Sequence, residues 1–150
     1  MRNGQLLIFD DMITSSVTAY TSAAHYDRLG SHDELAIVVV IDNVSTSSVG
    51  FDLFIEHSCD TRNWLQRNDP AQTSPPPNAP AFGDITFSGS NLPLLGTNTT
   101  YSRMFSDSCK GVSSKPGSTV DGPLLAYVRF AMKLSTGSAH VKVYVVQRDL

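Results

Sequence analysis

The chain has 150 residues, of which 17% are charged, and its formal net charge is −3. This length suits one domain whose core is large enough to fold without a disulfide or a metal ion. Because the charge is small and slightly negative, the sequence has no basic surface of the kind that binds nucleic acid or an anionic membrane, and we expect neither as a partner.

Residues 1–15 are predicted to form an N-terminal arm or an edge strand. They carry the apolar run Leu6-Leu7-Ile8-Phe9, whose four residues are candidates for pairing with the open sheet edge of a neighbouring subunit. Asp10-Asp11 follows; as neighbours in a strand the two point to opposite faces, and we expect both to be solvated. The apolar run is too short for a signal peptide, which predicts a protein made in the cytoplasm.

Residues 34–41 are predicted to form a strand in the middle of a sheet. They are apolar on both faces and rich in β-branched side chains, the composition of a strand covered on both sides. Their apolar run is far shorter than the roughly 20 residues that a membrane-spanning helix needs. The polar segment 42–50 then leads into 51–57, and we expect the two strands to form a hairpin.

Alternating apolar and polar residues mark two more strands, at 124–134 and 139–145. The turn Thr136-Gly137-Ser138 lies between them, which predicts a second antiparallel hairpin. The first of the two, around 125–130, is also the expected partner strand of 51–57.

Two long loops interrupt this pattern. Residues 68–80 are rich in proline, which cannot donate a ladder hydrogen bond, so we predict an extended loop with Pro75, Pro76 and Pro77 as candidate contacts to a partner. Residues 106–122 form a second polar loop. The whole pattern predicts an all-β, single-domain, antiparallel β-sandwich over residues 16–150, jelly-roll-like, with about eight or nine short strands.

The polar segment that follows residue 57 is predicted to be a tight turn. Ser58, Asp60 and Asn63 have short side chains that can hydrogen-bond to nearby backbone groups. Trp64, the single tryptophan of the chain, is expected to pack over the end of the sandwich. Arg129 is expected to pair within the chain, with a carboxylate across an interface as the alternative.

The sequence predicts no catalytic residue, no cofactor and no metal site. The histidines lack the spacing of zinc ligands; they are His25, His32, His57 and His140. Cys59 lies two residues from His57 without a third orienting group, so a buried thiol is favoured over a nucleophile. In a reducing compartment we expect Cys59 and Cys109 to be free rather than bridged.

The segments Ser58-Cys-Asp60-Thr-Arg-Asn63-Trp64 and Tyr127-Val-Arg129-Phe130, with a valine-rich strand after the second, resemble small β-sandwich virion proteins of tailed phages. A Ser-x-Asp-Gly-x-Asn-Trp turn and a Tyr-x-Arg strand recur in that family, and several members are capsid decoration (cement) proteins. Thr61 stands where glycine is usual. The resemblance implies a homotrimer on the capsid surface that binds the major capsid protein and stabilises the shell.

A carbohydrate-binding β-sandwich module is the alternative function. Its motivation is a set of aromatic side chains that could stack on sugar rings: Trp64, Tyr101, Tyr127 and Tyr144. Sugar binding requires two or more of them on one exposed face.

Overall fold

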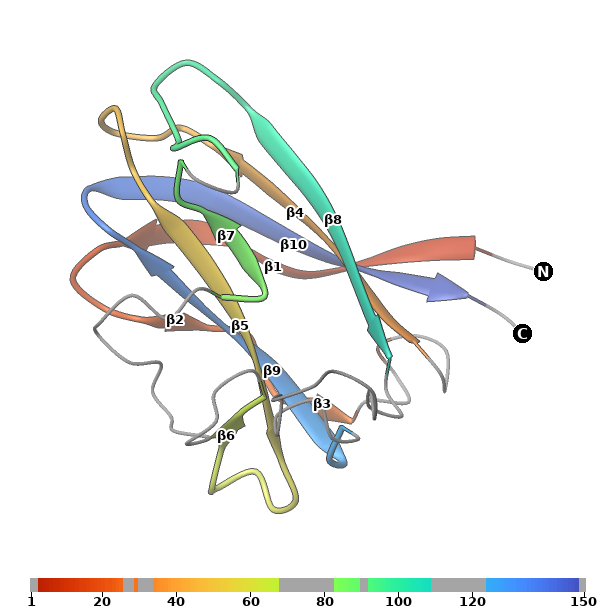
Figure 1. Cartoon of the computed structure of the whole chain (residues 1–150). Coiled ribbons are helices and arrows are strands. Elements are labelled where there is room, and N and C mark those ends of the chain that lie inside the picture. Colours follow the sequence, from red (N-terminus) through yellow and green to blue (C-terminus); the bar gives the residue numbers. More distant parts are fainter. Residues whose placement is uncertain are drawn as a thin grey trace, which may run out of the picture.

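The computed structural model describes residues 3–25, 29, 34–67, 83–89, 92–108 and 124–148. All regular structure in these ranges is β-strand (Figure 1). The strands are β1 (Asn3–Thr14), β2 (Ala19–Tyr20), β3 (Ala24–His25), β4 (Glu34–Asp42), β5 (Phe51–Ser58), β6 (Leu65–Gln66), β7 (Ile85–Phe87), β8 (Tyr101–Ser108), β9 (Tyr127–Leu134) and β10 (Ser138–Arg148).

The strands form two sheets that pack face to face. Sheet 1 has the order β1-β10-β4-β8; sheet 2 has the order β2-β9-β5-β6, with β3 also on β9 and β7 also on β5. All pairings within the described ranges are antiparallel. The prediction of an all-β antiparallel sandwich is confirmed, and the jelly-roll connection stays a prediction.

Alternation along the strands builds the core between the sheets. Alternate residues of β4, β10, β5 and β9 point inward, and the fully buried ones include Ile37, Val39, Ile41, Val141, Val143, Val145, Phe51, Leu53, Ile55, Val128, Phe130 and Met132. Burial of a side chain of this kind contributes about 1.5–3 kcal/mol. The central position predicted for 34–41 is correct, since β4 lies between β10 and β8. The predicted pairing of 51–57 with the segment around 125–130 is also correct, since β5 pairs with β9.

Both predicted hairpins are wrong. β4 and β5 lie in different sheets, and so do β9 and β10. The segments that join them cross the sandwich side by side and bond to each other: Ser45 N donates to Ser138 O at 2.9 Å, and Ser135 N donates to Gly50 O at 2.9 Å. The backbone groups of each crossing segment therefore bond to the other crossing segment. In a hairpin they would bond to the next strand of the same sheet.

Gly137, in one of these crossing segments, has a backbone that disfavours other residues. Its φ is +69°, and an added Cβ would lie 2.5 Å from Ser45 Oγ, the oxygen that accepts a hydrogen bond from Ser138 N. We expect Gly137→Ala to lower the free energy of unfolding by about 1–2 kcal/mol. Urea denaturation measures this change. Gly4→Ala is the control, because a Cβ there meets nothing within 4 Å; equal effects of the two substitutions would contradict the prediction.

The N-terminal segment pairs within its own chain. β1 runs antiparallel to β10 from Asn3 opposite Arg148 to Thr14 opposite Ser138, with a bulge between Leu7 and Phe9. The sequence allows an arm or an edge strand here, and residues 3–14 form the edge strand of sheet 1. The outer ends of β1 and β10 run side by side toward the two termini (Figure 1).

Candidate functional site

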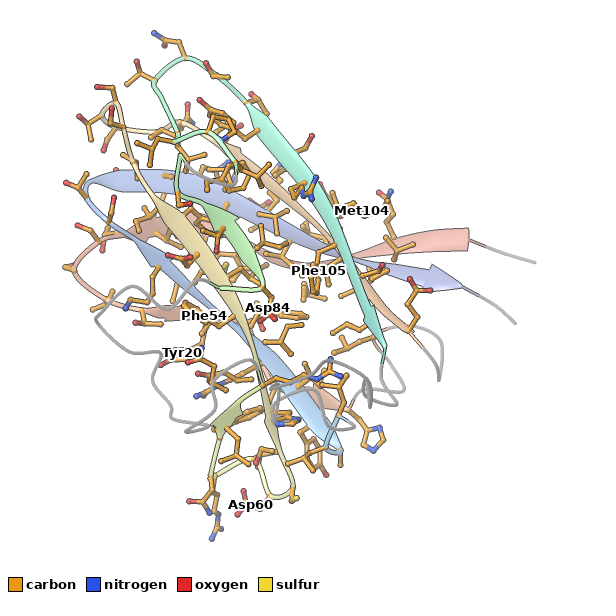
Figure 2. All side chains as sticks on the ribbon, viewed as in Figure 1. Tyr20, Phe54, Asp60, Asp84, Met104 and Phe105 are labelled. Carbon is orange, nitrogen blue, oxygen red and sulfur yellow. The ribbon has the colours of Figure 1, made fainter. Side chains whose placement is uncertain are left out.

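The turn between β5 and β6 is organised by the carboxylate of Asp60, which lies at the far end of the loop (Figure 2). It accepts hydrogen bonds from Asn63 N at 2.8 Å, Arg62 N at 2.9 Å, Asn63 Nδ2 at 2.8 Å and Ser58 Oγ at 2.9 Å. These donors, the backbone N–H of Asn63 foremost, hold the pKa of Asp60 well below its usual range. Ser58 Oγ in turn accepts from Thr61 N at 3.0 Å, so Ser58, Asp60 and Asn63 all bond within the turn.

Thr61 has a φ of +62°, a conformation that L-residues with a Cβ adopt at a cost. This gives a physical reason for the glycine that is usual at this position in the resembling proteins. We expect Thr61→Gly to raise the free energy of unfolding by about 0.5–1 kcal/mol, the relief of strain less the added entropy of the unfolded chain. Thr61→Ala keeps the Cβ and is the control; chemical denaturation of the two variants should separate them, and equal stabilisation by both would refute the explanation.

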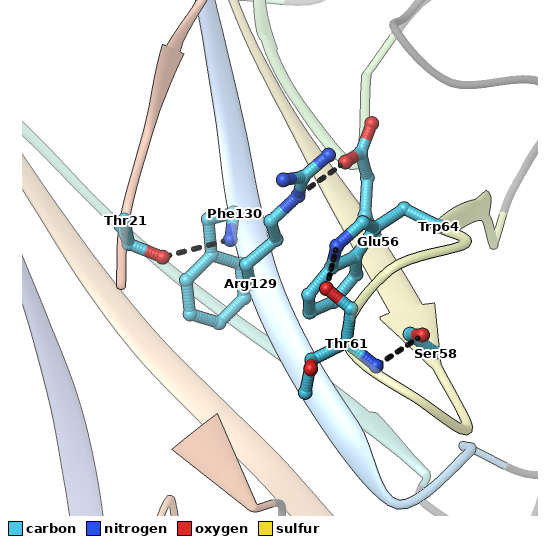
Figure 3. A network of polar contacts seen from close by, with 7 residues as sticks. All are labelled: Thr21, Glu56, Ser58, Thr61, Trp64, Arg129 and Phe130. Atoms are coloured by element: carbon cyan, nitrogen blue, oxygen red, sulfur yellow. Dashed lines mark hydrogen bonds and ion pairs between the residues drawn. The ribbon is translucent and has the colours of Figure 1, made fainter. Parts of the chain in front are cut away.

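Arg129 connects the two segments that carry the resemblance. Its guanidinium carbon lies 4.3 Å from the Trp64 ring centre and 4.1 Å from that of Tyr20, and its Nε donates to Glu56 Oε1 at 2.7 Å (Figure 3). Trp64 Nε1 donates to Thr61 O at 3.2 Å, which links the stack to the turn. Arg129 therefore pairs within the chain, and Tyr127 lies opposite Ser58 in the same pair of strands.

The outward face of sheet 2 is not open to solvent at its centre. Phe54 and Ala131 lie opposite each other on this face and are nevertheless buried, as is Glu56. β2 is held to β9 at the same level, since Phe130 N donates to Thr21 Oγ1 at 2.9 Å (Figure 3).

The outward face of sheet 1, in contrast, carries exposed apolar side chains. One row crosses all four strands: Leu7 lies opposite Tyr144, Tyr144 opposite Val38, and Val38 opposite Met104. Leu7 is 44% exposed and Met104 is 64% exposed. Met104 and its neighbour Phe105 point to opposite sides of the sheet (Figure 2), and Phe105 packs on the core. We call Leu7, Val38, Met104 and Tyr144 the apolar row.

The four predicted apolar contact residues of the N-terminal segment differ in exposure. Leu6 and Leu7 are exposed, whereas Ile8 and Phe9 are half-buried and pack against the core. The bulge between Leu7 and Phe9 explains why both Ile8 and Phe9 face inward. The other candidate contacts, Pro75, Pro76 and Pro77, lie outside the described residues.

His140 of β10 lies between two carboxylates. Its Nε2 lies 2.5 Å from Asp10 Oδ1 of β1, and its Nδ1 lies 2.7 Å from Asp42 Oδ1 of β4. A carboxylate only accepts hydrogen bonds, so the ring can donate to both partners only when both of its nitrogens are protonated and it is positively charged. The hydrogen bond to Asp10, and then that to Asp42, raise the pKa of His140. Asp10 is exposed, as expected, and it also pairs with His140.

This arrangement predicts that His140 stabilises the fold most at low pH. Because the folded pKa lies above the ordinary 6.5, the contribution is complete below pH 6.5 and is lost as the pH rises through the folded value. Lys142, opposite Asp10 on β10, is common to all variants. The difference in melting temperature between wild type and His140→Asn should shrink from pH 6 to pH 9; a constant difference would contradict the prediction.

The four aromatic residues considered for sugar binding do not share one exposed face. Tyr144 lies on sheet 1, whereas Trp64 stacks on Arg129 on sheet 2. The Tyr101 ring packs against Phe87 with ring centres 5.8 Å apart, and its hydroxyl accepts from Gly96 N at 2.8 Å. The Tyr127 ring makes an edge contact with His25.

A polar hollow of about 340 Å³ lies beside the end of β4. It is lined by Asp42, Asn43, Val44, Asn98, Thr99 and Thr100. Its amide, hydroxyl and carboxylate groups offer hydrogen bonds to a polar ligand.

Cys59 is a free thiol, as expected, but it is exposed instead of buried; Cys109 lies outside the described residues. In the part of the chain that the structure describes, no three His, Cys, Asp or Glu side chains are grouped so that they could hold a metal ion. Within the same ranges, no helix has the length and apolar character to cross a membrane.

Comparison with protein-family models, with curated proteins and with solved structures finds no match. The geometry of the chain itself therefore carries the functional argument.

Proposed function

We propose that this chain is a structural virion protein of a tailed phage, a capsid decoration protein that binds the major capsid protein and stabilises the shell. The observation that carries the proposal is the apolar row on sheet 1. The row joins the exposed Leu7 and Met104 through the half-buried Val38 and Tyr144, and exposed apolar patches mark protein–protein interaction sites. The row runs across all four strands of one sheet, so a large partner that binds there would contact every strand of sheet 1.

The virion assignment is supported by the two segments that carry the resemblance. They are far apart in the sequence, yet Arg129 of the second stacks on Trp64 of the first, and Tyr127 lies opposite Ser58. Residues that recur together in the resembling proteins thus form one structural unit in this chain. The resemblance is also the basis for the homotrimer in this proposal.

Cosedimentation with assembled shells of the major capsid protein tests the proposal. We expect the wild-type protein to sediment with the shells and to raise their melting temperature. Met104→Lys, which places a charge in the apolar row, should weaken binding at least about tenfold, since burial of a charge without a partner is costly. Val17→Lys is the matched control, because Val17 is 66% exposed and lies outside the strands. Absence of wild-type binding refutes the proposal.

A carbohydrate-binding module is a second candidate, favoured by the polar hollow beside β4. A glycan array combined with light scattering separates the two functions. A monomer that binds glycans strongly, and loses this binding in Asn98→Ala, would replace the capsid proposal.

A further inference from the structure

An apolar pocket opens between the two sheets, beside the edge of β1. Its volume is about 240 Å³, and its apolar lining is formed by Leu6, Ile8, Ala24, Leu29, Val128 and Phe130. An apolar cavity of about 150 Å³ already accepts a benzene ring, so this pocket has room for one large side chain. It is smaller than the roughly 300–1,000 Å³ of a typical pocket for a drug-sized ligand.

The pocket adjoins an open sheet edge. β1 is the terminal strand of sheet 1, and within the described ranges it pairs with β10 alone. The other side of β1 thus offers backbone N–H and C=O groups to a further strand. Leu6 and Ile8, which line the pocket, belong to this same strand.

A negative charge lies further along the same edge. Asp11 is opposite Val141, a core residue, so its side chain is on the inward side of sheet 1. Because β1 is at the edge, the carboxylate is exposed; it accepts a hydrogen bond from Met12 N at 2.8 Å. A strand added to β1 would place side chains over the pocket and over Asp11 on one and the same face, because alternate residues share a face.

We infer that β1 binds an extended strand of the partner protein in antiparallel pairing, with one apolar side chain in the pocket and one basic side chain over Asp11. In antiparallel order the basic residue precedes the apolar one by about four positions, an even spacing that keeps both side chains on one face. Main-chain hydrogen bonds supply affinity in this mode, and the side-chain pocket supplies specificity. The inference rests on the proposed function in one respect, namely that this strand belongs to the major capsid protein.

Charge argues against a second copy of β1 as the occupant. β1 has the sequence NGQLLIFDDMIT and contains no Lys or Arg. Two such strands paired edge to edge would bring acidic residues together and would leave Asp11 without a cation. A partner strand with a basic residue can pair with the open backbone groups of β1 and can also place a cation over Asp11.

Short synthetic peptides test the inference on the intact protein. The probe is a capped threonine peptide that carries one lysine and, about four positions later, one leucine. We expect it to bind in fluorescence anisotropy, and to lose binding when serine replaces the leucine. N-methylation of alternate residues should abolish binding in one of the two alternate sets and spare it in the other, because only one set of N–H groups faces β1.

Two protein variants complete the design. Asp11→Lys should weaken binding of the lysine peptide about five- to tenfold and should favour a peptide with glutamate in place of lysine. Ala23→Phe, at an exposed position on the pocket rim, should reduce binding of both peptides. Absence of peptide binding, equal loss from both N-methylated sets, or no effect of Asp11→Lys each overturns the inference.

The peptide experiment and the shell experiment test two different claims, the strand site and the proposed function. If wild-type protein binds shells but not the peptide, the strand site is wrong and the proposed function stands. If it binds the peptide but not the shells, the strand site stands and the proposed function is wrong. Dimers that dissociate on Asp11→Lys would identify a second copy as the occupant and would overturn the choice of partner.

Discussion

Arg129→Ala is expected to lower the free energy of unfolding by about 3–5 kcal/mol, the cost of removing one partner of a buried ion pair. Glu56 is completely buried and accepts the Arg129 Nε–H at 2.7 Å. The substitution takes this cation away from a carboxylate that water cannot reach. It also removes the cation–π contacts with Tyr20 and Trp64, each worth about 0.5–2 kcal/mol. Urea denaturation followed by circular dichroism measures the change.

Two further variants separate charge from stacking. Arg129→Lys keeps the charge but loses the planar group that lies between the two rings, so its effect should be intermediate. The double variant Arg129→Met with Glu56→Gln removes both charges and should be less destabilised than the sum of the two single variants. A loss below about 1 kcal/mol in Arg129→Ala would show that the ion pair is not a structural element of the sandwich.

Acidification from pH 7 to pH 4 is expected to destabilise the fold by about 2 kcal/mol through His57. Burial, and then the charge of Arg67, lower the pKa of His57 from 6.5 to about 4. The folded state therefore holds a neutral ring while the unfolded chain binds a proton. The stability that this provides is complete above pH 6.5 and is lost as the pH falls toward 4.

The hydrogen bond that the His57 ring accepts agrees with a neutral ring. Leu125 N donates to Nδ1 at 3.2 Å, which a protonated Nδ1 could not accept. His57→Asn keeps an acceptor but does not titrate, so the dependence of its stability on pH between 4 and 6.5 should flatten. Asp60 does not contribute to the slope between pH 4 and 6.5, because the stability that its lowered pKa provides is lost only below the ordinary carboxylate value of 3.8. An unchanged slope in His57→Asn would assign the acid sensitivity to another group.

Local alternation predicted the long strands well, because a two-residue period needs only neighbouring residues. Alternation predicts β5, β9 and β10 near their observed bounds, whereas β4 is predicted by its run of apolar, β-branched residues. The hairpins were wrong for a physical reason: a turn sequence does not say whether the chain returns to the same sheet or crosses to the other. β2, β3 and β6 have two residues each, too few to display a period; residues 16–22, which contain β2, show strand composition, whereas the sequence does not reveal β3 and β6.

The contacts of the candidate site depend on pairing that sequence reasoning could not reach. Trp64 and Arg129 were both expected to be structural, but their stacking requires β6 and β9 to flank β5. Glu56 offers a usable signal, since it is one of two carboxylates, with Asp52, in the otherwise largely apolar strand β5. The contact of His140 with Asp10 and Asp42 joins three strands, and it follows only from the order of sheet 1.

The pairing of β1 with β10 decides how the molecule responds to mechanical force. Asn3 lies opposite Arg148, and the ladder continues from there to Thr14 opposite Ser138. Its hydrogen bonds are perpendicular to the strands, so tension applied between the two chain ends loads them one pair at a time, starting from Asn3. Tension on these two ends would therefore break the hydrogen bonds of the ladder one after another at low force. Tension along the length of β4 or β5 would instead have to shear many hydrogen bonds at once.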